Sequence, residues 1–217
     1  MEWKELHARV WRGKVATTAR AVIPTGFREL DRALPGGGWP LGAITEILVD
    51  GYGIGELGLL MPALSALTKE DPAKPKKWVA WIAPPFIPYA PALQQHGVNV
   101  DRLLMIHPTS SVKSRLWAIE QAVRSGSSAG VLAWVAAAGG VVLRRLQLAA
   151  EEQGCWVLLF RPASARRERS PAALRIHVSQ AEAATRVEIV KCRGGWPSAV
   201  ELPGFALDGA ASQASGR

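Results

Sequence analysis

A glycine-rich turn between two apolar segments holds the residues whose types and spacing come nearest to a chemical site. The turn follows the apolar run 44–49, precedes a helical pattern over 57–67, and contains Gly51, Gly53 and Gly55. Strand, glycine loop and helix in this order form a phosphate cradle, because small residues let backbone N–H groups surround the phosphates. Such a cradle also needs a lysine for the β and γ charges and a hydroxyl for Mg²⁺.

The two positions after the glycines argue against phosphate chemistry. With Gly55 as the glycine before the lysine position, Glu56 takes the lysine position and Leu57 the hydroxyl position. A carboxylate there repels a triphosphate at close range, by an energy on the order of several kcal/mol. The spacing of Gly53, Gly55 and Gly58 also fits a dinucleotide fingerprint, but no acid ends the next strand, so we interpret the turn as a tight strand-to-helix connection.

Other chemical constellations are sparse. The four histidines show no metal-ligand spacing, and the chain has no nucleophile elbow or paired-carboxylate signature. Cys155 and Cys192 lie far apart without a CxxC pair, which indicates neither a disulfide framework nor a zinc site and fits a reducing cytoplasm. We therefore expect no catalytic residue, no metal and no cofactor, and hence no enzyme.

Length and composition predict one globular domain. The chain has 217 residues, of which 48% are hydrophobic and 20% charged, and this excludes a disordered chain and a coiled coil. The longest uncharged apolar run, 129–143, is too short for a bilayer, and the charged, mixed N-terminus is unlike a signal peptide. We expect a cytoplasmic protein without a membrane span.

Apolar runs and helical patterns alternate along most of the chain. Helices are predicted at 27–34, 57–67, 91–95, 113–124 and 141–153, and strands at 44–49, 78–83, 103–106, 129–135 and 155–160. This alternation predicts an α/β fold, a largely parallel sheet with helices on both faces, and two adjacent alternating strands, 174–178 and 185–191, predict an antiparallel C-terminal edge. The predicted organisation is an N-terminal helix and linker over 1–23, one domain over 24–200 and a flexible tail over 201–217.

The first residues have the pattern of an amphipathic helix with an aromatic stripe. Its apolar positions, at i, i+3, i+7 and i+8, are Trp3, Leu6, Val10 and Trp11. Two interpretations stay open: the stripe folds back onto the chain's own core, or it docks on a partner or on a second copy of the chain.

Several separated blocks resemble the RecA family. These blocks are 23–31, 34–40, 42–47, 77–108 and 186–197. The resemblance implies a RecA-like core over 24–200 in which the glycine turn is a degenerate P-loop. It also marks positions where the family's polar groups are missing: Trp134 at the magnesium aspartate, Pro84 and Pro85 at the water-activating carboxylate, and Pro162 at the nucleotide-sensing glutamine. A RecA-like pseudo-ATPase is therefore implied.

Within the RecA-like proteins, the chain resembles the ImuA family, accessory proteins of translesion DNA synthesis in the bacterial SOS response. The segments that carry this resemblance are 9–13, 34–40, 53–57 and 187–195. It implies a non-catalytic role in SOS mutagenesis and DNA repair, with ImuB as a partner and RecA as a further one. The alternative is a cell division inhibitor of the SulA type, a related protein without a P-loop that binds FtsZ and shares the Gly-Glu-Leu helix start at 55–57.

Positive charge concentrates toward the C-terminus. The net charge is +8, and 161–193 holds eight basic against three acidic residues. The candidate cations for binding a partner or DNA are Arg161, Arg166, Arg167, Arg169, Arg175, Lys191 and Arg193. In RecA the loop after the strand at 155–160 contacts single-stranded DNA, so the resemblance implies DNA near these residues. The loop lacks an aromatic for base stacking, so any DNA contact should be weak and made to phosphates alone. A solvated basic face and an acidic protein partner are the other interpretations.

Overall fold

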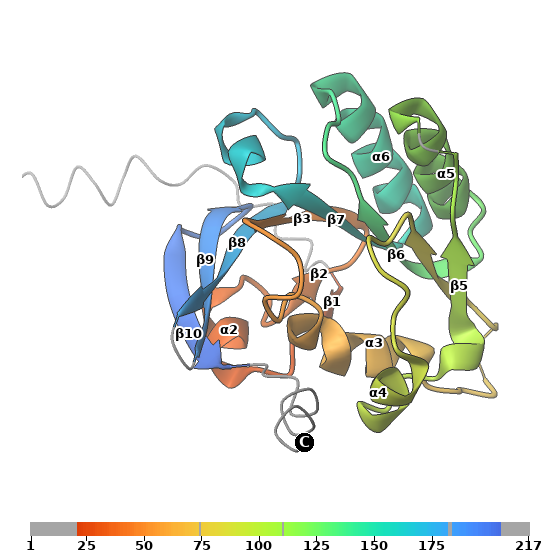
Figure 1. Cartoon of the computed structure of the whole chain (residues 1–217), viewed down its shortest axis with the longest axis horizontal. Helices are drawn as coiled ribbons and strands as arrows, with labels where there is room; N and C mark the ends of the chain where they lie inside the picture. Colours follow the sequence, from red (N-terminus) through yellow and green to blue (C-terminus); the bar gives the residue numbers. More distant parts are fainter. Residues whose placement is uncertain (1–20, 74, 110, 182–183, 205–217) are drawn as a thin grey trace, which may run out of the picture.

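An eight-stranded sheet with helices on both faces forms the body of the protein (Figure 1). The computed structural model describes residues 21–204 except 74, 110 and 182–183. The strands of the sheet are β3 (Ala43–Val49), β4 (Trp78–Ile82), β5 (Leu103–Ile106), β6 (Ser128–Trp134), β7 (Trp156–Pro162), β8 (Leu174–Ala181), β9 (Ala184–Cys192) and β10 (Ser198–Pro203). A separate antiparallel pair joins β1 (Val22–Ile23) and β2 (Trp39–Pro40).

The strand order β10-β9-β8-β3-β7-β6-β4-β5 combines two kinds of pairing. The strands from β8 to β5 in this order pair in parallel, whereas β9 and β10 pair antiparallel. All seven residues of β3 are buried, as is typical of a strand in the middle of a parallel sheet covered on both faces. The predicted α/β fold with a largely parallel sheet and an antiparallel C-terminal edge is confirmed.

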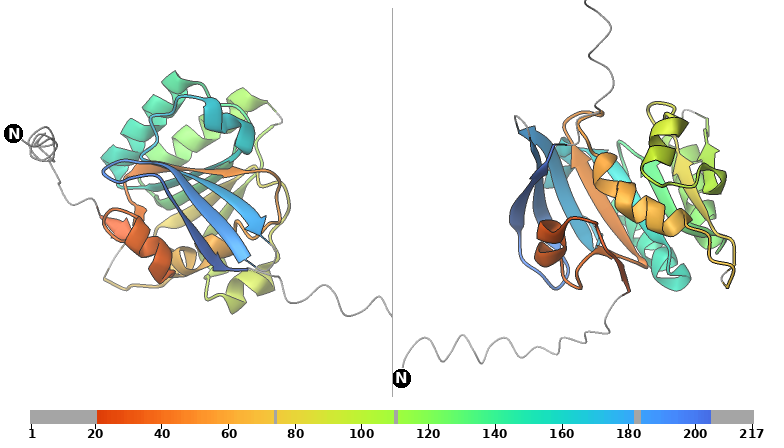
Figure 2. Two further views of the ribbon diagram at one scale, coloured as in Figure 1. Left: turned by 90° about the vertical axis from the view of Figure 1, so that its left-hand side faces the viewer. Right: turned by 90° about the horizontal axis from the view of Figure 1, so that it is seen from below.

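Two sets of helices cover the two faces of the sheet (Figures 1 and 2). One face carries α5 (Val112–Arg124) and α6 (Gly140–Gln153), and the other carries α2 (Arg28–Ala33), α3 (Met61–Thr68) and α4 (Ala90–Gln95). Short 3₁₀ turns are η1 (Gly58–Leu60), η2 (Val100–Arg102) and η3 (Ala163–Arg167). None of the helices within the described ranges is long and apolar enough to cross a membrane.

Local signals fix where the longer helices begin and end. The Ser111 side chain accepts the backbone N–H of Ser114 and so caps the start of α5. Helix α6 stops at Gly154, whose φ of 62° lies in the left-handed region that glycine adopts without strain. These two helices bury Ile119, Leu143 and other apolar side chains against their face of the sheet, which holds the start of α5 close to the strand ends described below.

One strand of the eight-stranded sheet was not predicted, and it corrects the boundary of the tail. Residues 201–203 belong to β10, which pairs with β9, so the predicted tail over 201–217 starts too early. Leu202 is buried, whereas most of its neighbours on this edge strand are exposed. Because so few positions of this short edge strand are buried, its sequence shows little apolar periodicity. Pro203 is tolerated because an edge strand leaves some backbone N–H positions unpaired.

Candidate functional site at the carboxyl edge of the sheet

The segments in which the sequence lacks the predicted nucleotide-binding side chains lie together at one edge of the sheet. Because β3, β4, β6 and β7 are parallel, their carboxyl ends lie at the same edge. The glycine turn follows β3, Pro84 and Pro85 follow β4, Trp134 ends β6, and Pro162 ends β7 beside Val49. Apolar side chains thus stand at the ends of β4, β6 and β7, where the resemblance to the RecA family implies carboxylates and an amide.

Glu56 closes the glycine turn from within. Its carboxylate accepts the backbone N–H of Gly53 at 3.0 Å through Oε1 and that of Ile54 at 2.9 Å through Oε2. The residue is only 4% exposed. The turn reaches this geometry because Gly53 and Gly55 have φ angles of 82° and 95°. Two N–H groups that could face a phosphate are therefore already bound to a carboxylate of the same chain.

Two further positions of the predicted degenerate P-loop, Gly51 and Leu57, offer no side-chain group for a nucleotide. Gly51 is exposed, and the Leu57 side chain packs against the apolar core and offers no oxygen for a metal. Elsewhere in the described part of the chain, no three His, Cys, Asp or Glu side chains gather closely enough to hold a metal ion.

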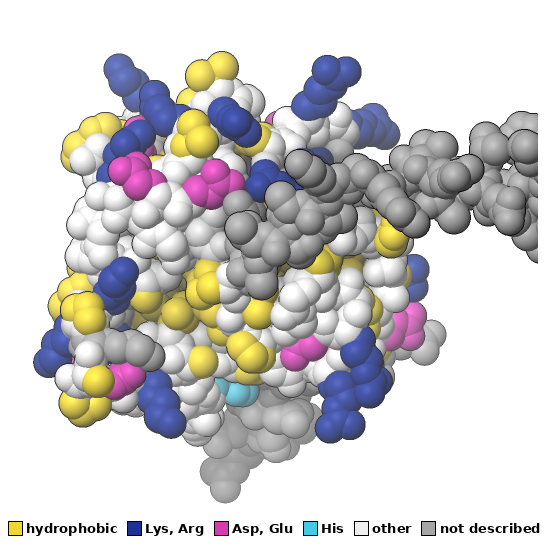
Figure 3. Space-filling model, turned by 180° about the vertical axis from the view of Figure 1, so that it is seen from behind, with side chains coloured by type: hydrophobic (Ala, Val, Ile, Leu, Met, Phe, Trp, Pro, Cys, Tyr) yellow, Lys and Arg dark blue, Asp and Glu magenta, His cyan; other side chains and the backbone are white. Residues whose placement is uncertain are grey.

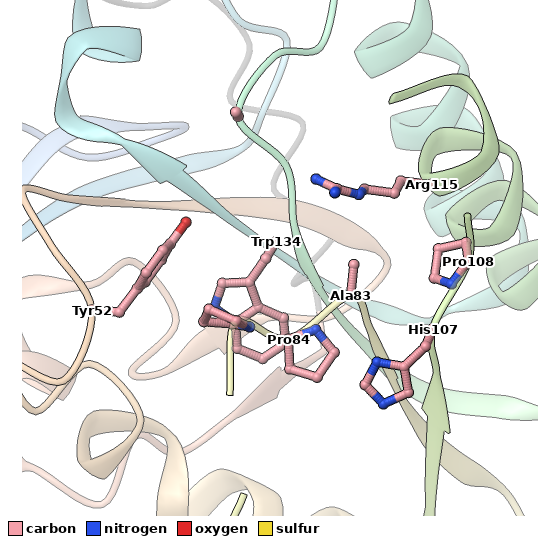
Figure 4. Close-up of a pocket in the computed structure, with 9 residues that line it drawn as sticks. Tyr52, Ala83, Pro84, His107, Pro108, Arg115 and Trp134 are labelled. Atoms are coloured by element: carbon pink, nitrogen blue, oxygen red, sulfur yellow. The ribbon is translucent and has the colours of Figure 1, made fainter. Parts of the chain in front are cut away.

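Beside the closed turn lies a pocket of about 460 Å³ (Figure 4). Its lining combines three polar side chains with small and apolar ones, and consists of Tyr52, Ala83, Pro84, Pro85, His107, Pro108, Arg115, Trp134 and Ala136. The buried Trp134 ring stacks on Phe160 with centroids 4.5 Å apart, which fixes one wall. Ala83 has a φ of 52°, the one positive value at a non-glycine residue among those described, and such strain is concentrated at functional sites in proteins.

Arg115 and Tyr52 approach the pocket from opposite sides (Figure 4). Burial raises the pKa of the Tyr52 phenol, the Glu56 carboxylate raises it further, and the Arg115 guanidinium opposes these effects. The Tyr52 phenol therefore stays protonated at neutral pH. The Arg115 side chain has no hydrogen bond or ion pair within the described residues, and its Nε atom is buried without a partner.

The loop from β4 to α4 presents large apolar side chains to solvent. Phe86 is 71% exposed, Ile87 87% and Tyr89 73%. Prolines restrict the backbone around them, at positions 84, 85, 88 and 91. We call residues 84–89 the proline loop. Exposed apolar side chains gathered in this way are typical of interaction surfaces. Phe86, Ile87 and Tyr89 were not predicted from the sequence, because a run of apolar residues broken by prolines has neither a helical nor a strand period.

Two of the predicted binding cations are buried, and this corrects their assignment. Arg161 and Arg175 both pair with Glu46 inside the sheet: Arg161 Nη1 lies 3.1 Å from Oε1 and Arg175 Nε 2.5 Å from Oε2. Arg175 also donates to the backbone carbonyls of Ala165 and Glu168. These two arginines therefore fix the segment after β7 onto the sheet and are not available to DNA or a partner. Burial of a charge requires such pairing, and Glu46 supplies it.

The other five cations of the basic segment differ in how far they are neutralised. Arg166 forms two hydrogen bonds with Glu188, Arg193 pairs with Glu151 at 3.3 Å, and Lys191 donates to the Ser170 carbonyl at 2.6 Å. Burial, followed by the charges of Arg175 and Arg193, lowers the pKa of Lys191. The two cations without a partner in the described residues are Arg167 and Arg169, both exposed. Figure 3 shows the back of the molecule with basic side chains in separate groups near its margin, not in one continuous patch.

The fold and the site define an α/β protein with a closed glycine turn. Comparison of its sequence with known proteins gives one weak similarity. No protein-family model matches the chain. The chain shows weak homology to the cell division inhibitor SulA of Serratia marcescens, with 28% identity over 143 residues, which cover 64% of this chain and 80% of SulA. The predicted docking helix with Trp3, Leu6, Val10 and Trp11 lies outside the described residues and stays a prediction.

Proposed function

We propose that this chain is a non-catalytic accessory protein of the SOS response that acts by binding other proteins. The observation that carries the proposal is the closed glycine turn, in which Glu56 accepts the N–H groups of Gly53 and Ile54. The prolines after β4 and Trp134 at the end of β6 support the same interpretation, because they offer no carboxylate for metal or water. The proline loop supports a protein-binding role, since it exposes three large apolar side chains on a restricted backbone.

Translesion DNA synthesis is the first candidate process. The resemblance to the ImuA family supports it and implies that the chain is a RecA-like pseudo-ATPase that binds ImuB, with RecA as a further partner and no cofactor. Inhibition of cell division is the second candidate, and the 28% identity to SulA over 143 residues supports it. In that case FtsZ is the expected partner. In both cases we assign partner binding to the proline loop.

ATP turnover tests the non-catalytic part of the proposal. We expect the purified chain to release no phosphate from ATP, with or without single-stranded DNA. Glu56→Lys should not create turnover, because Pro84, Pro85 and Trp134 still leave the site without a metal ligand and a base. DNA-stimulated turnover that a substitution in the glycine turn abolishes would overturn the proposal.

Direct binding to ImuB, RecA and FtsZ tests the partner. We expect ImuB to bind, and the double variant Phe86→Ala, Tyr89→Ala to weaken binding by about 2 kcal/mol or more, as for aromatic residues at the centre of an interface. Val141→Ala is the matched control, because Val141 is 83% exposed but lies on α6. Binding to FtsZ without binding to ImuB selects the second candidate, and binding to none of the three proteins contradicts both.

A further inference from the structure

The pocket beside the proline loop contains a cation without a counter-ion. Two other arginines on α5 and α6, Arg124 and Arg145, are neutralised: both pair with Glu120, at 3.0 Å and 2.6 Å. Arg115 has no such pair within the described chain, and its buried Nε atom has no hydrogen-bond partner. A buried donor without an acceptor is destabilising, so the Arg115 guanidinium is an unsatisfied group at the edge of the pocket.

The lining around Arg115 favours an anion with apolar neighbours. Among the described residues that line the pocket there is no acidic side chain, and the other polar groups are the Tyr52 phenol and the His107 ring. Proline, alanine and tryptophan make up the rest of the lining. Figure 4 shows the Arg115 guanidinium on the side of the pocket facing Tyr52. The planar fork of a guanidinium matches the two oxygens of a carboxylate.

A phosphate group fits this pocket less well than a carboxylate. The N–H groups of Gly53 and Ile54 are bound to Glu56, so the nearest backbone donors of the turn are not free. The negative charge of Glu56 also acts on the pocket, since it influences the Tyr52 phenol. The Arg115 guanidinium balances the single charge of a carboxylate, whereas a dianionic phosphate brings a second charge, and no second arginine or lysine lines the pocket among the described residues.

The pocket and the proline loop form one continuous surface. Pro84 and Pro85 line the pocket, and the next two residues, Phe86 and Ile87, are among the most exposed apolar side chains of the described chain. A polypeptide lying across this surface would meet a cation in the pocket and apolar side chains directly beside it. We propose that Arg115 binds an aspartate or glutamate side chain of the partner protein, and that apolar residues next to this acidic residue pack on the proline loop. This assignment rests on the proposed protein-binding function.

Selection from a random peptide library displayed on phage tests this assignment. The wild-type chain should select peptides with an acidic residue flanked by apolar ones. Arg115→Glu should lose these peptides and select basic residues at the same position, whereas Arg144→Glu should select as the wild type does. Arg144 is the matched control because it is exposed on α6 and has no partner in the described residues. Unchanged selection by Arg115→Glu, or no acidic preference in the wild type, would overturn the proposal.

A double-mutant cycle measures the pair itself. Replacing the acidic residue of a selected peptide by its amide should weaken binding to the wild type by about tenfold or more, and should have little effect on Arg115→Ala. Arg115→Lys should recover part of the affinity, and thermal unfolding of each variant reports whether it is folded. Displacement of the peptide by millimolar inorganic phosphate would identify a small-anion site and contradict the assignment. Failure of ImuB, RecA and FtsZ to bind would reject those partners while leaving the peptide result intact.

Discussion

Removing the Glu56 carboxylate should loosen the glycine turn and destabilise the fold. The carboxylate accepts hydrogen bonds from Gly53 and Ile54 and is almost fully buried. Glu56→Ala deletes both bonds, whereas Glu56→Gln keeps one acceptor oxygen but places an amide donor beside the other N–H group. Glu152→Ala is the matched control, because Glu152 is an exposed carboxylate at the end of α6.

The expected magnitude follows from the charge of the acceptor. Hydrogen bonds to charged groups contribute about 1.5–3 kcal/mol, and water can reach part of the opened turn, so Glu56→Ala should lower the free energy of unfolding by about 2 kcal/mol. For a chain of this size that corresponds to a fall in Tm of about 4–8 °C. Glu56→Gln should lose about half as much. Urea unfolding followed by circular dichroism measures these differences.

Amide hydrogen exchange locates the effect. In Glu56→Ala the Gly53 and Ile54 amides should exchange at least about tenfold faster than in the wild type, because the loss of about 1.5 kcal/mol of protection corresponds to that factor. The exchange rates of amides in the buried strand β3 should rise only as far as the fall in global stability requires. If Glu56→Ala were no less stable than Glu152→Ala and the two amides exchanged at unchanged rates, the carboxylate would not hold the turn.

Three further predictions concern the buried groups and the basic segment. Glu46→Gln should lower the free energy of unfolding by about 3–5 kcal/mol, measured in urea, because it leaves two buried guanidiniums without a full counter-charge. Burial raises the pKa of the Cys155 thiol to about 12, so at pH 8 a disulfide reagent should modify Cys155 only after unfolding and Cys192 sooner. In the basic segment, Arg167 and Arg169 are the exposed candidate cations without a partner among the described residues. Log affinity for single-stranded DNA should therefore fall with log salt by about 1.4, from two phosphates at about 0.7 each; a slope twice as steep would contradict this count.

The strands and helices could be predicted because their apolar patterns are local. The run at 129–135 is continuously apolar, the run at 44–49 is apolar except for Thr45 and Glu46, and the structure places β6 and β3 there. The antiparallel edge was predicted from alternating residues, but only for β8 and β9. Strand β10 escaped prediction since its pairing with β9 supplies the stability that its own sequence lacks.

The candidate site was harder to predict because its contacts join distant parts of the chain. Arg161 and Arg175 belong to a run of arginines that is normally exposed, and their burial depends on Glu46, which lies 115 positions before Arg161. A single sequence gives no sign of that pairing. The pocket combines residues after β3, β4, β5 and β6 with one from α5, so Arg115 could be identified only once the fold had placed it beside the proline loop.

The distribution of hydrogen-bond donors explains why this edge suits a carboxylate better than a nucleotide. A phosphate site uses several backbone N–H groups together with a cation. Here Glu56 takes the N–H groups of Gly53 and Ile54, so the Arg115 guanidinium stands without them, among proline, alanine and tryptophan. Closing the turn therefore removes phosphate binding but leaves a charge that one carboxylate with apolar neighbours can match. It follows that Glu56→Ala should relax the exclusion of phosphate and leave the pairing of Arg115 with an acidic peptide intact.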